Sequence, residues 1–177
     1  MQLNLFEVPT TLPVKLHENF LSHAEADALL IHCEKLVWMQ NQIRMLGKQI
    51  PVPRLECMYG LEKAVYVYSG SVELKALHWT EDLLSVRSRI TDLCGYQFDI
   101  VIGNLYRDGQ DSIGWHADNQ LSMGKRPAIA SISLGATRKF SIKSTESSSK
   151  REVCRTETSV RRASPTHYWL EHGSRYC

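Results

Sequence analysis

Residues 97–106 constrain the fold more than any other part of this 177-residue chain, because their side chains alternate between two faces. In a β-strand, successive residues point to opposite sides of the sheet. One face of the predicted strand carries Phe98, Ile100, Ile102 and Asn104. The opposite face carries Asp99, Val101, Gly103 and Leu105. The segment is therefore predicted to form a β-strand, and Asp108-Gly109 predicts the turn that follows.

Two helices and several further short strands are predicted around this segment. Ser22-His-Ala-Glu25 is a capping-box pattern that begins a helix over residues 23–37. A second helix begins at Thr80, and Gly95 is its predicted stop. The remaining strands are predicted over residues 64–68, 112–118, 128–134, 139–143 and 167–170. This order predicts an α+β fold, a sheet sandwich or jelly roll with helices packed on one face.

Composition limits the class of protein. The chain is 43% hydrophobic and 23% charged, which excludes a wholly disordered chain and predicts one domain with a sizeable core. Apolar runs fall well short of the roughly 20 residues of a membrane helix, and residues 1–15 lack the pattern of a secretory signal. Five scattered cysteines without a CxxC pair indicate a reducing compartment. We therefore expect an intracellular protein, cytoplasmic or nuclear, with no membrane partner.

Charge is unevenly distributed along the chain. Formal net charge is −3 over residues 1–137 and +5 over residues 138–177. A basic end is weak support for a polyanionic partner, and a solvated tail is the simpler interpretation. From residue 144 onwards the sequence is polar and apolar residues are few. We therefore predict a domain over residues 1–143 and a divergent, basic tail over residues 144–177.

The segment Trp115-His116-Ala117-Asp118 carries the sharpest chemical pattern. On a strand, His116 and Asp118 project to the same face. An imidazole and a carboxylate at one point supply two of the three ligands in the facial triad of non-haem Fe(II) oxygenases. Taken alone, the pair is a weak signal, because a histidine two residues from an aspartate is common by chance and a surface pair is the favoured interpretation.

The surrounding motifs resemble those of the AlkB family of Fe(II)/2-oxoglutarate dioxygenases. They are Asn104-Leu-Tyr106, the run from Asp111 to Asp118, and the segment 127–140, which reads PAIASISLGATRKF. The resemblance covers about residues 46–142. It implies a double-stranded β-helix core and oxidative demethylation of N-alkylated nucleic-acid bases. In this reaction the methyl group leaves as formaldehyde, and succinate and CO2 are the co-products.

The resemblance also implies a role for individual residues near the iron. His116 and Asp118 correspond to iron ligands. Asn104 and Tyr106 correspond to residues that hydrogen-bond 2-oxoglutarate, and amide and phenol groups can both donate to a carboxylate. Fe(II) and 2-oxoglutarate are therefore the expected cofactor and cosubstrate.

Residues 41–70 resemble the nucleotide-recognition region of the DNA-repair members. Tyr66 and Tyr68 share a strand face and correspond to aromatic residues that stack on the flipped base, although a packing pair in the core is the alternative. Met45 and Leu46 correspond to an apolar wedge at a hairpin tip, where a plain hairpin is the alternative. Arg54 is a candidate phosphate contact. The expected partner is alkylated DNA carrying 1-methyladenine or 3-methylcytosine, bound by a monomer.

The chain departs from the family near residue 177. Leu170-Glu-His172-Gly-Ser174 matches the start of a family segment that leads to a third histidine ligand and two arginines. Here the sequence continues Arg175-Tyr-Cys177, without the matching residues. We therefore expect incomplete C-terminal strands and weak or absent dioxygenase activity. A non-catalytic, nucleic-acid-binding remnant is the main alternative, and an unrelated jelly-roll metal protein is a weaker one.

Overall fold

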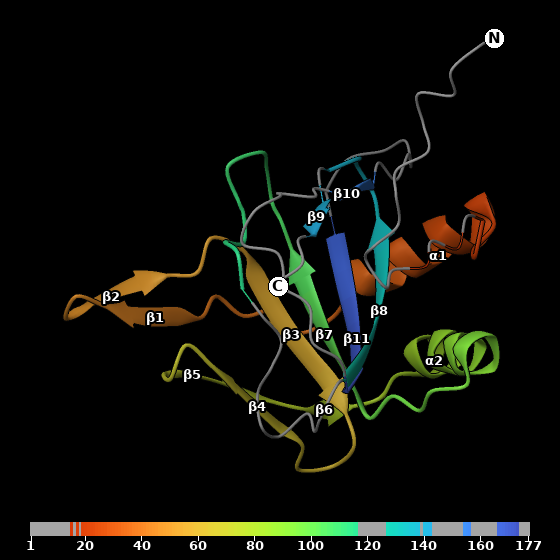
Figure 1. Ribbon diagram of the computed structural model, residues 1–177, viewed down its shortest axis with the longest axis horizontal. Coiled ribbons are helices and arrows are strands. Elements are labelled where there is room, and N and C mark those ends of the chain that lie inside the picture. Colours follow the sequence, from red (N-terminus) through yellow and green to blue (C-terminus); the bar gives the residue numbers. More distant parts are fainter. Residues whose placement is uncertain are drawn as a thin grey trace, which may run out of the picture.

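The computed structural model describes residues 15, 17, 19–116, 127–138, 140–142, 154–156 and 166–173 (Figure 1). Its helices are α1 (His23–Glu34) and α2 (Glu81–Cys94). The strands before α2 are β1 (Gln42–Met45), β2 (Lys48–Pro51), β3 (Leu55–Gly60), β4 (Val65–Tyr68), β5 (Val72–Lys75) and β6 (Leu77–His78). The strands after α2 are β7 (Ile100–Leu105), β8 (Pro127–Leu134), β9 (Phe140–Ile142), β10 (Cys154–Thr156) and β11 (Thr166–Gly173).

A five-stranded sheet with the order β6-β3-β7-β11-β8 forms the centre of the molecule. Its pairs are antiparallel except for β3 with β6. Strands β1 and β2, β4 and β5, and β9 and β10 form separate antiparallel pairs. The described strands form an open sheet and no closed barrel. The predicted combination of helices and strands is therefore confirmed, and a sandwich of two sheets stays a prediction.

The predicted domain boundary at residue 143 does not separate the later residues from this sheet. Strand β11 lies between β7 and β8, and Thr166 faces Leu105 on one side and Leu134 on the other. The segment HYWLEH contains the run Tyr168-Trp-Leu170, whose aromatic and aliphatic residues favour a strand that both neighbours can pair with. The final strand was predicted over only residues 167–170, and it is twice that length.

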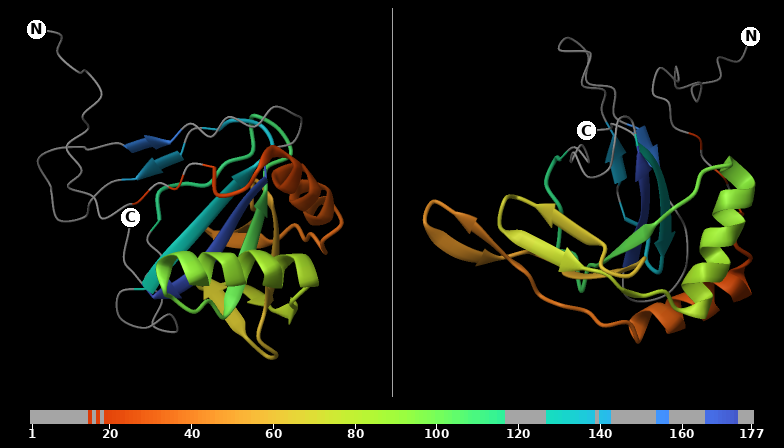
Figure 2. Two further views of the ribbon diagram at one scale, coloured as in Figure 1. Left: turned by 90° about the vertical axis from the view of Figure 1, so that its right-hand side faces the viewer. Right: turned by 90° about the horizontal axis from the view of Figure 1, so that it is seen from below.

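The helices and the hairpins lie on opposite sides of the central sheet. Figure 2 shows α1 and α2 against one face, while the β1–β2 and β4–β5 hairpins extend from the other side. This arrangement confirms the prediction that the helices pack on one face. Within the predicted nucleotide-recognition region, residues 41–70, strand β3 belongs to the sheet. The β1–β2 and β4–β5 hairpins that involve this region lie on the side away from the helices.

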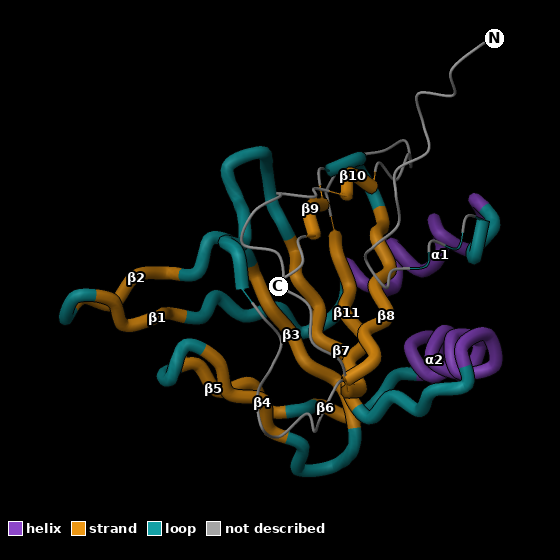
Figure 3. The backbone as a smooth tube through the Cα atoms, viewed as in Figure 1, coloured by secondary structure: helices purple, strands orange, loops and turns teal. Residues whose placement is uncertain are grey.

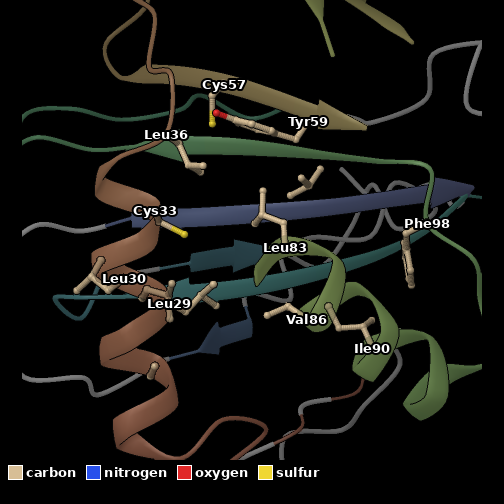
Figure 4. Close-up of a cluster of buried hydrophobic side chains, with 13 residues drawn as sticks. Leu29, Leu30, Cys33, Leu36, Cys57, Tyr59, Leu83, Val86, Ile90 and Phe98 are labelled. Atoms are coloured by element: carbon tan, nitrogen blue, oxygen red, sulfur yellow. The ribbon is translucent and has the colours of Figure 1, made fainter. Parts of the chain in front are cut away.

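A large apolar cluster joins the helices to the sheet (Figure 4). Leu29 and Cys33 of α1 meet Leu83 and Val86 of α2 and the underside of β3 and β7. Val101 belongs to this cluster, as the alternation within β7 predicts. Phe98 also belongs to it, although it was predicted on the opposite face, because β7 begins only at Ile100 and the alternation does not extend back.

A second, smaller cluster covers the other face of the sheet. Met58 of β3 and Ile102 of β7 pack there against Tyr66 of β4 and against Val72 and Leu74 of β5. Val101 and Ile102 of β7 are therefore buried by different clusters on opposite faces of the sheet.

Local hydrogen bonds explain where the helices begin and end. In α1 the Ser22 hydroxyl accepts from the Glu25 backbone N–H, and the Glu25 carboxylate accepts from the Ser22 N–H, so the predicted capping box is present. The helix ends at Glu34, three residues before the predicted end. The Trp38 indole N–H donates to the Cys33 carbonyl at 2.9 Å, which satisfies a group that a longer helix would use. Thr80 and Gly95 cap α2 as predicted.

The predicted strand over residues 112–118 is wrong for its described part. Residues 106–116 form a loop after β7, shown in teal between the orange strands in Figure 3. Arg138 holds the part of this loop before Ser112, as shown below, and the Ser112 N–H donates to the Pro53 carbonyl at 2.9 Å. Among the described helices, none is both long and apolar enough to cross a membrane.

The close approach of β7 to its neighbours requires glycine at position 103. A Cβ at Gly103 would lie 2.6 Å from the Cys57 Sγ and 2.8 Å from the Trp38 ring. We expect Gly103→Ala to lower the free energy of unfolding by about 1–3 kcal/mol, the usual cost of overpacking. Urea unfolding followed by circular dichroism measures this. Gly109→Ala is the control, because a Cβ there meets nothing within 4 Å. Equal stabilities for the two variants would contradict the packing argument.

Candidate functional site

Strand β7 and the residue that follows it bring Asn104 and Tyr106 to the face away from the helices. Both are buried. The Asn104 Oδ1 accepts from the Arg54 Nε at 2.7 Å, which leaves the amide nitrogen, a donor, pointing away from Arg54. Burial raises the pKa of Tyr106, whereas the positive charges of Arg54 and Arg138 oppose the rise. Tyr106 is therefore a neutral phenol, which is able to donate.

A buried ion pair lies beside Asn104. Arg54 is only 7% exposed, and its Nη2 donates to the Glu56 Oε1 at 2.6 Å. Glu56 is 1% exposed and also accepts from Asn41 and from the Tyr68 hydroxyl through its Oε2. This placement does not suit the phosphate contact predicted for Arg54, because its guanidinium is engaged inside the protein.

Tyr66 and Tyr68 lie on β4 with ring centroids 6.0 Å apart and planes tilted by 35°. Tyr66 is buried in the smaller apolar cluster, whereas Tyr68 is partly exposed and close to Arg54. Burial and the hydrogen bond to Glu56 raise the pKa of Tyr68. Tyr66 therefore packs in the core, as in the alternative interpretation of the sequence. Tyr68 lies at the edge of the core, where part of its ring is accessible.

The β1–β2 hairpin ends in a two-residue turn at Leu46 and Gly47. Both have positive φ values, 50° and 77°. Leu46 is 97% exposed and the neighbouring Met45 is half exposed. A leucine in the left-handed region costs about 1–2 kcal/mol relative to right-handed backbone, and full exposure offsets none of that cost. The tip is therefore an apolar, strained and solvated point.

His116 lies at the end of the loop after β7, on the surface. Its Nδ1 lies 2.9 Å from the Gly114 carbonyl oxygen. A carbonyl can only accept, so this contact assigns the proton to Nδ1 and the lone pair to Nε2. That tautomer is the form a metal ligand needs, with the other nitrogen held by a backbone carbonyl. Asp118 lies outside the described residues.

Two arginines hold the loop that leads to His116. Arg107 makes a bidentate pair with Asp111, through Nε at 2.7 Å and Nη2 at 2.9 Å. Arg138, which follows β8, donates to the carbonyls of Asp108 and Asp111 and stacks over Tyr106 at 4.5 Å. Arg138 therefore ties the residues after β8 to the loop after β7.

Among the side chains that the structure describes, no group of three or more histidine, cysteine, aspartate or glutamate residues is placed to hold a metal. His116 is the one predicted ligand whose position is given. Sequence reasoning missed Glu56. The signal that could have identified it is a single charged residue in the strand Leu-Glu-Cys-Met-Tyr-Gly, whose other positions are apolar or small.

The tether at Asp111 predicts a pH-dependent stability. Hydrogen bonds from Arg107 hold the pKa of Asp111 below its ordinary value. Its charged form therefore stabilises the fold above the unfolded pKa of about 3.9, and this contribution is lost as the pH falls through the lower folded value. We expect Asp111→Asn to lower the thermal midpoint clearly at about pH 7 and much less at about pH 2. Thermal unfolding at both pH values measures this, with Asp92→Asn on the exposed side of α2 as the control. A loss that is equal at both pH values would contradict the assignment.

Comparison with known proteins places these residues in a family. The sequence model of the 2OG-Fe(II) oxygenase superfamily matches residues 13–177. The chain is 37% identical over 131 residues to alpha-ketoglutarate-dependent dioxygenase alkB homolog 3 from Rattus norvegicus, covering 73% of this chain and 44% of the relative. It is 35% identical over 131 residues to the Homo sapiens protein of that name, covering 73% of this chain and 45% of the relative. It is 34% identical over 155 residues to DNA oxidative demethylase ALKBH2 from Bos taurus, covering 85% of this chain and 53% of the relative.

The chain thus spans about half the length of these curated relatives. The similarity confirms the AlkB-like resemblance of the motifs, and the family match extends through β11 to residue 177. The chain belongs to the 2OG-Fe(II) oxygenase superfamily.

Proposed function

We propose that this protein removes methyl groups oxidatively from N-alkylated DNA bases of the 1-methyladenine and 3-methylcytosine type, using Fe(II) and 2-oxoglutarate. The family match and relatives named as a dioxygenase and a DNA oxidative demethylase support the proposal. The observation that carries it is the shared position of Asn104, Tyr106 and His116 on β7 and the loop after it, inside the matched region. The family implies a jelly roll, and we propose that β9 and β10 belong to its second sheet.

The described residues fit the roles of ligand and cosubstrate anchor. His116 has its Nδ1 proton held by the Gly114 carbonyl, which is the arrangement of a histidine that binds a metal through Nε2. The Asn104 amide nitrogen and the Tyr106 hydroxyl are donors suited to a carboxylate of 2-oxoglutarate, and their burial strengthens such bonds. When bound, iron and 2-oxoglutarate supply the oxidation of the methyl group by O2. We propose Asp118 as the second protein ligand.

Tyr66 and Tyr68 are proposed to recognise the base. A methylated base must leave the duplex to reach an enzyme's site, and stacking on an aromatic ring offsets part of the unstacking cost. 1-Methyladenine and 3-methylcytosine carry a positive charge, which the face of a tyrosine ring attracts. Tyr68 is the better placed of the two because it is partly exposed, whereas Tyr66 is fixed in the core.

The β1–β2 hairpin is proposed to enter the duplex and fill the gap left by the flipped base. An exposed leucine in a strained conformation is costly to the free protein, and such costs gather at functional positions. Apolar side chains inserted between base pairs are a known way to stabilise distorted DNA. Arg44 and Lys48, on the exposed hairpin, are proposed as phosphate contacts.

Demethylation that depends on His116 is the central test. We expect the protein to release formaldehyde when it is given Fe(II), 2-oxoglutarate and an oligonucleotide with one 1-methyladenine. His116→Ala should abolish the release, and His78→Ala, at an exposed histidine of β6, should preserve it. Mass spectrometry of the oligonucleotide measures the loss of the methyl group. Binding of the methylated strand without any release would favour the non-catalytic alternative.

The hairpin makes a separate prediction about duplexes. We expect Leu46→Ser to weaken binding to a methylated duplex several-fold and to leave binding to the methylated single strand unchanged, because only a duplex has a gap to fill. Fluorescence anisotropy with labelled oligonucleotides measures both. Leu61→Ser, at a half-exposed leucine after β3, is the matched control. Equal weakening for the duplex and the single strand would argue against a wedge.

A further inference from the structure

We propose that Glu56 is a positioning residue that fixes the base-binding tyrosine, the cosubstrate-binding asparagine and the root of the hairpin relative to one another. The consequence is that binding of a methylated base and binding of 2-oxoglutarate are energetically coupled. This inference rests on the proposed function and adds a residue that neither the sequence motifs nor the resemblance identified.

The partners of the Glu56 carboxylate are all hydrogen-bond donors. Oε1 accepts from the Arg54 Nη2 at 2.6 Å, and Oε2 accepts from the Asn41 Nδ2 at 2.8 Å and from the Tyr68 hydroxyl. A carboxylate can accept from all three at once. Glutamine has the same shape but presents one acceptor and one donor, so one of its ends would face a donor. The site is therefore specific for the charged side chain.

The Tyr68 arm reaches the predicted base-binding side. Tyr68 lies on β4, which pairs with β5 and not with the central sheet. Its hydroxyl bond to Glu56 on β3 is thus a side-chain tie between the β4–β5 hairpin and the sheet. The tie holds one end of the ring, and so it sets the plane on which a base would stack.

The Arg54 arm reaches the cosubstrate side. Glu56 and Asn104 are direct partners in the β3–β7 register, and their side chains share a face of the sheet. Arg54 bridges them, with Nη2 on Glu56 and Nε on the Asn104 Oδ1 at 2.7 Å. The rigid guanidinium therefore transmits the position of the carboxylate to the amide that is proposed to hold 2-oxoglutarate.

The Asn41 arm reaches the hairpin. Asn41 immediately precedes β1, and its carbonyl accepts from the Val52 N–H at 2.9 Å, just after β2. One residue thus closes the base of the hairpin with its backbone and binds Glu56 with its side chain. Nucleic acid bound at the hairpin tip would therefore affect the position of the carboxylate that orients Tyr68 and Arg54.

Stability alone is a poor reason for this arrangement. Removing a carboxylate and a guanidinium from water is costly, and apolar residues of similar volume often stabilise a core as well or better. The neighbours of Glu56 in the sequence, Leu55, Cys57 and Met58, are apolar, so apolar residues in place of both Glu56 and Arg54 would match the segment. The charge is instead placed where three segments with different proposed ligands meet.

Oligonucleotide binding under non-turnover conditions tests the coupling. Fluorescence anisotropy is measured with a strand carrying one 1-methyladenine and with the unmodified strand, in Mn(II), with and without 2-oxoglutarate. We expect 2-oxoglutarate to tighten binding of the methylated strand by about tenfold in the wild type, within the usual range of site–site coupling. In Glu56→Gln the factor should fall close to one. Glu73→Gln, which removes a surface carboxylate paired with Lys75 on β5, should retain the wild-type factor.

A second variant and a spectroscopic signal distinguish a specific loss of coupling from a general folding defect. Tyr68→Phe keeps the stacking ring and removes only the hydroxyl, so its coupling factor should fall several-fold even if Glu56→Gln is too unstable to study. Protein containing 3-fluorotyrosine gives a ¹⁹F resonance for Tyr68, assigned by its absence in Tyr68→Phe. Glu56→Gln should shift this resonance in the ligand-free protein, whereas Glu73→Gln should not.

The outcomes separate the two proposals. A wild type that binds methylated and unmodified strands equally overturns the proposed function, and the inference with it. A wild type that prefers the methylated strand but shows no effect of 2-oxoglutarate overturns the inference alone. The same holds if Tyr68→Phe and every soluble Glu56→Gln sample keep the wild-type coupling factor, or if the ¹⁹F resonance is unchanged in Glu56→Gln.

Discussion

The register between β3 and β7 is the constraint on which the rest of the structure depends. It places Cys57 near Gly103 on the helix side, and Glu56 opposite Asn104 on the other. A slip of one residue would exchange the faces of β3. The Glu56 carboxylate would then enter the apolar cluster beneath the helices and lose its bonds from Asn41 and Tyr68, and a buried charge without its partners costs several kcal/mol. The polar network of Glu56 therefore discriminates between registers, and the correct register brings the candidate site residues together.

The two faces of the sheet divide the tasks of the molecule. The helix side is closed by apolar contacts from α1 and α2, and its apolar cluster includes none of the predicted site residues that the structure describes. The opposite side has a smaller core and holds the polar network, the tyrosines and both hairpins. Hydrogen bonds made by Arg138 and Asp111 hold the loop before His116. A rigid layer on one side thus supports a polar, partly strained layer on the other.

Local patterns predicted the parts of this structure that local forces decide. The capping box of α1, the caps of α2 and the alternation within β7 all act over a few residues, and all were found. The described part of the strand expected at residues 112–118 was not, because contacts with Pro53 and Arg138, which are distant in the sequence, hold this loop and periodicity does not reveal them. Glu56 was missed for the same reason, since its partners come from Asn41, Arg54 and Tyr68. The motifs gave Asn104, Tyr106 and His116 because a shared chemistry was recognisable in the sequence itself.

The central position of β11 has a consequence for how the chain reaches its structure. Strands β7 and β8 are adjacent to β11 but not to each other, although they precede it in sequence by more than 30 residues. Until residues 166–173 are synthesised, both strands present unpaired backbone edges, and such edges invite association with other chains. Closing the sheet also requires contacts of long sequence separation, which form slowly. During translation the nascent chain would therefore depend on the late arrival of a single strand, and its exposure to chaperones would last until that strand inserts.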